Sequence, residues 1–325
     1  MKFEETRETY GKIATLYYMG ELSQGEIAGM FGISRFKVAR VLNRCRELNI
    51  IEFHINHKPH YYKSLETRIE ELLSVSNCII VRPGATMYES KAAVGKAAAK
   101  YLADSLKDGM MVGFDWGTTL QTMVREFTPV RKYKECLFVQ ISGSVASQSL
   151  QDNNYMDGHD IVKTLAATAG AGWSLFPAPY IVKDRMLRDM LLEEKSIKTH
   201  ISKFGKLDMA FFGVGSRHPE VFLPFYRVFL TPEECEELVN ENGKGELLSC
   251  LLDNNGDAQK SLLTGRVLTI DIKMLRDIPD TVVLAAGQEK TPSLIAGARG
   301  GYFKTMIITE IVALSIVEYF ENGGG

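Results

Sequence analysis

The stretch from Met111 to Leu120, MVGFDWGTTL, combines residue types that can bind an anion. An apolar run of strand character ends in a Gly-containing loop, and a helix is predicted to begin at Thr118. A loop between a parallel strand and a helix directs backbone N–H groups and the positive helix end toward one point. Gly117 lets the chain turn, and Thr118 and Thr119 can cap the helix or donate hydroxyl hydrogen bonds to a phosphate. These residues also fit an ordinary capped turn, so the loop alone leaves both interpretations open.

A second chemically active group lies on a predicted helix that begins after Ser34. Basic and amide side chains share one face of this helix, opposite an apolar face that begins at Val38. Arg and Asn can make bidentate hydrogen bonds to base edges, and Lys and Arg can neutralise phosphates. The candidate DNA-contacting residues are Ser34, Arg35, Lys37, Arg40, Asn43 and Arg44. The alternative is a charged helical hairpin with a solvated face, but such faces usually mix signs, and here basic residues dominate.

Local sequence signals predict the elements that position this basic helix. Ser23 and Glu26 form a predicted capping box for a preceding short helix, and Gly32 ends that helix. Two short helices joined by a turn containing Gly are typical of a helix-turn-helix. A further helix is predicted at 6–19, and a strand that opens a small wing is predicted at 50–59.

Downstream of Cys78, short apolar runs alternate with helical segments. This alternation predicts an α/β fold in which helices cover both faces of a parallel sheet. Ligands of such sheets bind at the carboxyl ends of the strands. Several predicted strand ends carry Gly, Ser, Thr or Gln: Gly113 to Thr119, Gln140 to Ser144, Gly213 to Ser216 and Gly287 to Lys290. A pair of strands is also predicted at 247–270, with its turn at 253–256.

Composition and charge limit the class of protein. The 325 residues are 45% hydrophobic and 24% charged, which is ordinary for a soluble globular protein of two or three domains. Residues 1–63 contain ten Lys or Arg and seven Glu, a net charge of +3, so the total of −2 leaves −5 for the remainder. A small basic head therefore precedes a mildly acidic body.

Several kinds of site are not indicated. The cysteines, which form no CxxC pair, are Cys45, Cys78, Cys136, Cys235 and Cys250. A reducing cytoplasm fits this pattern, without disulfides or a zinc cluster. His54, His57 and His60 match no zinc spacing, so no metal is predicted. The sequence has no run of 18 apolar residues and no signal peptide, so no membrane span is predicted. It has no Walker sequence and no complete dinucleotide fingerprint, so no cofactor is predicted. It has no catalytic Ser-His-Asp order, so no catalytic residue is predicted.

Together these segments resemble the SorC family of bacterial sugar-responsive transcriptional regulators, and the resemblance covers nearly the whole chain. The segments that carry it, in order, are LSQGEIAGMFGISRFKVARVL, VGFDWGTTL, VQISG, LFPAPYIV, FFGVGS, LLDNNGD and AAGQEKTPSLIAGARGGYFKTMIITEIVA.

The resemblance implies a winged helix-turn-helix followed by a Rossmann-like effector domain related to phosphosugar isomerases. The expected boundaries are 1–58 for the DNA-binding domain, 59–76 for a linker helix and 77–322 for the effector domain. Such proteins form homo-oligomers, commonly tetramers. They bind operator DNA and a phosphorylated sugar or related metabolite, and the ligand commonly releases the repressor from DNA.

The resemblance also implies the residues that bind the effector. Gly117, Thr118 and Thr119 match the phosphate loop of the family. Asp253 matches an acidic position that contacts sugar hydroxyls, and Lys290 matches a lysine near the phosphate. The full set is Gly117, Thr118, Thr119, Gln140, Gly143, Asp253 and Lys290. The chain departs from the family pattern at Gly245-Glu246 and at Ala286-Gly287-Gln288, which leaves the identity of the sugar open. Trp116 is expected either to cover the ligand or to pack against a helix.

Two other functions remain as alternatives. The likeness to phosphosugar isomerases allows an enzyme, for which Asp253 or Asp257 would be the candidate base. The third alternative is a nucleotide or redox sensor. A helix-turn-helix in front of the body favours the regulator over both.

Overall fold

The computed structural model describes residues 3–20, 22–48, 50–51, 60–145 and 156–324. The chain divides into two compact units, Met1–Pro59 and His60–Gly325. Most of the predicted wing lies outside the described residues. None of the helices within the described ranges combines the length and the apolar composition needed to cross a bilayer.

The first unit contains three helices, α1 (Arg7–Tyr18), α2 (Gln24–Phe31) and α3 (Arg35–Glu47). The capping box of α2 forms, because the Glu26 amide donates to Ser23 Oγ and the Ser23 amide donates to Glu26 Oε2. Gly32 ends α2 in the left-handed conformation with φ of +65°. The three predicted helices of the head are therefore confirmed, and one apolar cluster holds them together.

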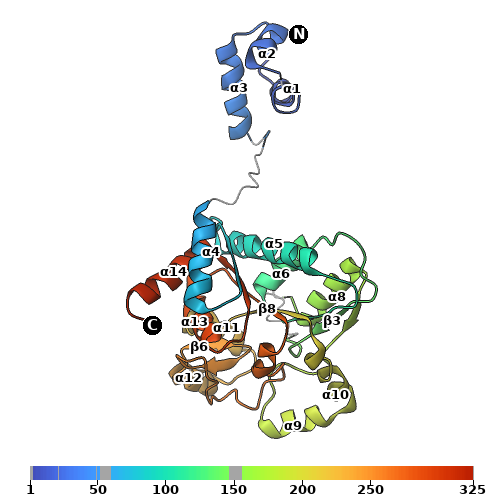
Figure 1. The fold of residues 1–325 in the computed structure, drawn as a ribbon, viewed down its shortest axis with the longest axis vertical. Coiled ribbons are helices and arrows are strands. Elements are labelled where there is room, and N and C mark those ends of the chain that lie inside the picture. Colours follow the sequence, from blue (N-terminus) through green and yellow to red (C-terminus); the bar gives the residue numbers. More distant parts are fainter. Residues whose placement is uncertain (1–2, 21, 49, 52–59, 146–155, 325) are drawn as a thin grey trace. The chain divides into compact units, whose positions relative to one another are not determined.

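The second unit is built around a seven-stranded sheet in which every neighbouring pair is parallel, in the order β1-β9-β8-β5-β2-β3-β4. The predicted α/β class is therefore confirmed (Figure 1). The strands of this sheet are β1 (Asn77–Val81), β2 (Met111–Phe114), β3 (Leu137–Gln140), β4 (Gly172–Ser174), β5 (Met209–Gly213), β8 (Asp280–Ala285) and β9 (Thr305–Thr309).

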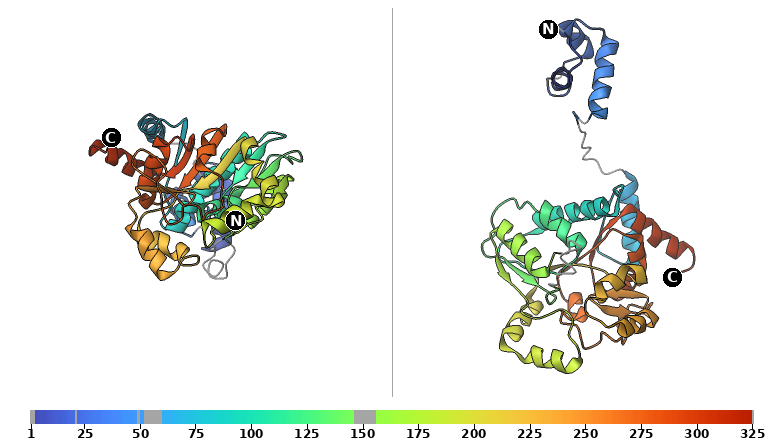
Figure 2. Two further views of the ribbon diagram at one scale, coloured as in Figure 1. Left: turned by 90° about the horizontal axis from the view of Figure 1, so that it is seen from below. Right: turned by 180° about the vertical axis from the view of Figure 1, so that it is seen from behind.

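Helices cover both faces of the sheet, as Figure 2 shows from two further directions. One apolar cluster joins α5, α6 and α8 to one face, and another joins α4, α13 and α14 to the other. The α-helices of this unit are α4 (His60–Leu73), α5 (Met87–Ser105), α6 (Thr118–Glu126), α8 (Gly158–Ala169), α9 (Arg185–Glu193), α10 (Lys195–Ile201), α11 (Pro219–Tyr226), α12 (Pro232–Asn240), α13 (Thr291–Arg299) and α14 (Glu310–Glu321). Short 3₁₀ turns are η1 (Phe204–Lys206), η2 (Ile272–Arg276) and η3 (Gln288–Lys290).

Burial on both faces explains why the strands read as continuous apolar runs. In β5, Phe211 and Phe212 are both fully buried, yet they belong to the clusters on opposite faces. Successive strand side chains point to opposite sides, so a strand covered on both sides needs apolar residues at every position.

The structure contains a pair of strands near the predicted segment 247–270, but the positions of the strands and of their turn differ from the prediction. The hairpin consists of β6 (Gly245–Leu247) and β7 (Cys250–Leu252), and its turn is at Leu248 and Ser249 rather than at 253–256. Both turn residues have positive φ, +50° and +57°. A two-residue hairpin of this kind usually contains Asn or Gly, so Leu248 and Ser249 carry no local turn signal.

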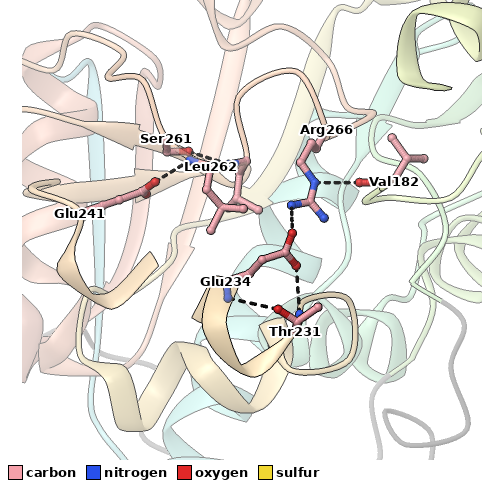
Figure 3. Close-up of polar contacts among 8 residues, drawn as sticks. Val182, Thr231, Glu234, Glu241, Ser261, Leu262 and Arg266 are labelled. Atoms are coloured by element: carbon pink, nitrogen blue, oxygen red, sulfur yellow. Dashed lines mark hydrogen bonds and ion pairs between the residues drawn. The ribbon is translucent and has the colours of Figure 1, made fainter. Parts of the chain in front are cut away.

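Arg266 fixes the segment after β7 against α12 (Figure 3). Its Nη1 donates to Glu234 Oε1 at 2.7 Å, and its Nε donates to the carbonyl oxygen of Val182 at 2.9 Å. Glu234 also accepts from the Thr231 amide in the capping box of α12. Charge-assisted bonds of a buried arginine are strong and directional, so they hold α12, which contacts α11, against the segment around Val182.

The chain changes direction across the sheet between β2 and β5. After β2 it proceeds outward through β3 to β4, and it then returns to β5 and proceeds the other way through β8 to β9. The carboxyl ends of β2 and β5 therefore form a topological switch point, where parallel sheets leave room for a ligand.

Candidate ligand pocket and nucleic-acid interface

A pocket of about 470 Å³ opens at this switch point, within the size range of small-molecule sites. Its described lining comes from the loops after β2, β5 and β8, Tyr180 in the segment after β4, the β6–β7 hairpin, α11 and the first turns of α5 and α6. Segments far apart in the sequence thus converge on one cavity.

One side of the pocket is formed by the start of α6. Gly117 is the N-cap residue, and its φ of +143° is a conformation that residues with a Cβ rarely adopt. Glycine has no side chain, so no cap hydrogen bond is made to the first-turn amides of α6. These N–H groups and the hydroxyls of Thr118 and Thr119 are available to an anion. The expectation that the threonines cap the helix was wrong, because the helix already includes Thr118.

Two lysines line the same pocket. Lys91 comes from α5, and Lys290 lies in η3 directly after β8. Burial lowers the pKa of both ammonium groups. Nearby Glu289 partly opposes the shift of Lys91, and Glu246 and Glu289 partly oppose the shift of Lys290. A phosphate group bound among the lysines and the α6 amides would receive charge-assisted hydrogen bonds and relieve the repulsion between the two cations.

A buried network of hydroxyls and one carboxylate forms another wall. Tyr226 Oη lies 2.9 Å from Glu246 Oε1 and 2.8 Å from Ser249 Oγ, which is also 2.8 Å from Tyr180 Oη. Burial raises the pKa of Glu246, and its Oε2 has no hydrogen-bond partner among the described residues. A buried acceptor without a partner is costly, so a ligand hydroxyl that donates to this oxygen would be favoured.

Trp116 contributes an aromatic surface beside this network. Its ring stacks on Phe225 of α11 with centroids 4.5 Å apart, and it meets Tyr180 edge-on at 5.4 Å. The same ring lines the pocket, and its Nε1 has no partner among the described residues. The expectation that Trp116 packs against a helix is confirmed, whereas the expectation that it covers a ligand stays a prediction.

Asp115 precedes the α6 loop and is a buried carboxyl group in the pocket lining. Ser142 Oγ donates to its Oδ1 at 2.6 Å. Burial raises the pKa of Asp115 to about 7, and the bond from Ser142 partly opposes this. The group is therefore poised to change charge near neutral pH.

The raised pKa of Asp115 predicts a pH-dependent stability. Between about pH 4 and pH 7 the unfolded chain ionises this group while the folded chain retains its proton, so stability falls as pH rises through this window. Asp115→Asn keeps an oxygen that accepts from Ser142 and should remove this loss. Urea unfolding of the full chain at about pH 5 and about pH 8 measures the difference by fluorescence, because Trp116 and Trp173 both lie in the second unit. An identical pH dependence in the two proteins would contradict the prediction.

Three of the effector residues implied by the resemblance lie away from the described pocket lining. Gln140 is fully buried, and its Oε1 accepts from the Phe176 amide at 3.1 Å. Gly143 packs so closely on the backbone of Pro179 that a Cβ would lie 2.4 Å from its carbonyl oxygen. The Asp253 carboxylate accepts from backbone amides of its own turn, at 2.9 Å each. These residues hold the local structure, whereas Gly117, Thr118, Thr119 and Lys290 are brought together in the pocket.

Sequence reasoning missed several residues of the lining. Lys91 lies within an alanine-rich helix that gave no sign of a site, and α11 was not predicted, because Pro224 interrupts its pattern. In the sequence, only a departure from the family pattern marks Glu246.

In the first unit, α3 presents the predicted DNA-contacting residues. Ser34 caps the helix by accepting from the Lys37 amide. The other five lie on α3, but they differ in their partners. Lys37 pairs with Glu5 at 3.2 Å, Arg44 pairs with Glu47, and Asn43 accepts from Arg46. Arg35 and Arg40 are exposed and make no ion pair with any described residue, so their guanidinium groups are available.

Comparisons with known proteins agree with this arrangement. Residues 58–318 match the family model described as "Putative sugar-binding domain". The chain is 24% identical to the sorbitol operon regulator of Klebsiella pneumoniae, over 91% of this chain and 93% of that protein. It is also 24% identical to the deoxyribonucleoside regulator of Bacillus subtilis, over 94% of this chain and 95% of that protein.

A solved structure shows the same fold. The crystal structure of the full-length sorbitol operon regulator from Klebsiella pneumoniae superimposes with a TM-score of 0.76 at 24% identity. The match covers 97% of this chain and 100% of that chain.

Proposed function

Because this chain belongs to the sugar-binding-domain family of SorC-type regulators, we propose that it is a DNA-binding transcriptional regulator controlled by a phosphorylated sugar or related metabolite. The relatives are named as regulators, which supports the regulatory role. The proposal for the ligand rests on the pocket of this chain.

The observation that carries this proposal is the division of the pocket into two kinds of wall. The α6 amides, Lys91 and Lys290 supply donors and positive charge, as a phosphate requires. Glu246, Ser249 and the neighbouring tyrosines supply acceptors and hydroxyls, as a sugar requires. A polar ligand with an anionic end and a hydroxylated end matches both walls.

We propose that the ligand releases the protein from its operator. A ligand can shift DNA binding only through its different affinities for the two arrangements of the protein, a coupling of about 1–3 kcal/mol in typical cases. Fluorescence anisotropy of a labelled operator duplex, titrated with sugar phosphates and with the unphosphorylated sugars, tests both parts. Release by phosphorylated sugars alone supports the proposal. If sugar phosphates bind the protein but none of them changes its affinity for the operator, the coupling is refuted.

We further propose that the protein acts as a homo-oligomer, a dimer or tetramer, bound to a palindromic operator. Helix α9 supports this, because none of its residues is buried and Met186 and Met190 are 71% and 64% exposed.

Association through α9 gives a direct prediction. Met186→Glu combined with Met190→Glu should reduce the mass of the full chain in solution, measured by light scattering, because charges would replace the apolar contact. Val130→Glu is the matched control, since Val130 is 78% exposed elsewhere on the second unit. The interface does not involve α9 if the double variant keeps the mass of the unmodified protein.

A second candidate function is an isomerase-like enzyme acting on sugar phosphates. Asp115 favours it, because a carboxyl group with a pKa of about 7 in a pocket can act as a general base. Asp253 and Asp257, the candidates from the sequence, lie outside the described pocket lining. Incubation with pentose and hexose phosphates, followed by NMR, separates the two functions, because product formation indicates an enzyme and binding without turnover indicates a sensor.

A further inference from the structure

Phe36, the second residue of α3, has the most exposed large apolar side chain among the described residues, at 86%. The other large apolar side chains of this helix, such as Val38 and Leu42, are buried in the cluster that joins α1, α2 and α3. Phe36 takes no part in that cluster. Its ring therefore contributes nothing to the core of the first unit and exposes its apolar area to solvent.

The surroundings of Phe36 indicate what chemistry would cover it. Arg40 and Asn43 lie four and seven positions further along α3, so they share its face of the helix. Arg35 is the adjacent residue, and both Arg35 and Arg40 are exposed and make no ion pair with a described residue. This surface therefore joins an apolar ring to two available guanidinium groups. A polyanion that also presents an apolar group is complementary to it.

Duplex DNA presents such a combination in its major groove. Phosphates and guanine edges attract arginine, and the single apolar group on the base edges is the C5 methyl group of thymine. The N-terminal residues of a recognition helix are those that reach the base edges. We propose that Phe36 contacts a thymine methyl group in each half-site of the operator and so determines part of the sequence specificity. This inference rests on the proposed DNA-binding function.

The test removes the methyl group from the DNA and the ring from the protein independently. In vitro selection from a random duplex pool, with the full-length protein, supplies the binding sequence. Each thymine of that sequence is then replaced in turn by deoxyuridine, which lacks only the C5 methyl group. One such replacement per half-site is expected to weaken binding of the unmodified protein by about three- to ten-fold, the scale of one buried methyl group and its neighbouring contacts.

The variant Phe36→Ala should bind the methyl-containing and methyl-free duplexes with affinities that differ by less than about two-fold. Met19→Ala is the matched control, because Met19 is similarly exposed on the same unit and lies outside α3. This control should retain the full effect of the methyl group. Phe36→Leu keeps an apolar side chain and should retain part of it.

Failure of this inference differs from failure of the proposed function. If the unmodified protein binds a selected duplex but no deoxyuridine replacement matters, the contact with Phe36 is refuted and DNA binding stands. Equal methyl sensitivity in Phe36→Ala and the unmodified protein also refutes it. If the unmodified protein selects no sequence and binds no duplex at low salt, the proposed function fails, and this inference fails with it.

Discussion

Replacing Lys290 with methionine is expected to weaken binding of a phosphorylated sugar by about 10–100-fold, the scale of a lost hydrogen bond to a charged group. The ammonium group lies in the pocket lining, where burial lowers its pKa and so disfavours its charge in the free protein. Methionine keeps most of the aliphatic length and removes the charge. The free protein should therefore fold normally, and the loss should appear only with ligand. Calorimetric titration with pentose and hexose phosphates measures it.

Lys100→Met is the matched control for this experiment. Lys100 pairs with Asp104 on the exposed side of α5, at 2.8 Å, and is no part of the pocket lining. Its replacement should leave the affinity for the sugar phosphate unchanged. If Lys290→Met also kept the original affinity, Lys290 would play no part in phosphate binding. Affinity for the unphosphorylated sugar should be similar in all three proteins.

Replacing Arg40 with alanine is expected to weaken operator binding by about 5–150-fold for each half-site while leaving sugar-phosphate affinity unchanged. The guanidinium group is exposed on α3 and makes no ion pair with a described residue, so it can bind a base edge or a phosphate without breaking an internal contact. One bidentate base contact contributes about 1–3 kcal/mol, and two half-sites increase the loss. Fluorescence anisotropy across a range of salt concentrations measures the affinity and its salt slope.

The salt slope separates two roles of Arg40. A phosphate contact predicts a slope smaller by about one per subunit and a uniform loss on all sequences, whereas a base contact predicts relaxed specificity at one position. Lys12→Ala is the control, because Lys12 pairs with Glu8 on α1 at 2.7 Å. Unaltered operator affinity in Arg40→Ala would exclude this residue from the interface. Equal losses of DNA and sugar-phosphate affinity would contradict separate sites.

Local sequence signals were sufficient for the three helices of the first unit. The Ser23–Glu26 capping box and the left-handed Gly32 each depend on residues within one turn, and both were predicted correctly. The resemblance to SorC-type regulators, which began with this segment, is confirmed by the family match over 58–318 and by the relatives. The contact of α3 with DNA, and the bases that it reads, stay predictions.

In the second unit, local sequence signals predicted the parallel sheet but only some of the residues that line the pocket. Gly117 and Lys290 follow strand ends, and the sheet topology brings them together. Asp253 also follows a strand, but its own turn satisfies its carboxylate. The family resemblance could not predict these hydrogen bonds of Asp253, because it indicates only which positions correspond. It does not indicate the partners of each side chain.

The sequence by itself determined the periodic elements, the basic face of α3 and the loop at Gly117, because each depends on residues near one another along the chain. Only the tertiary structure decided that Glu246, from the β6–β7 hairpin, faces the same cavity as Lys91 from α5. It also placed Trp116 against α11, a helix with an internal proline. These pairings depend on strand order and on the packing of distant segments, and neither leaves a periodic trace in the sequence.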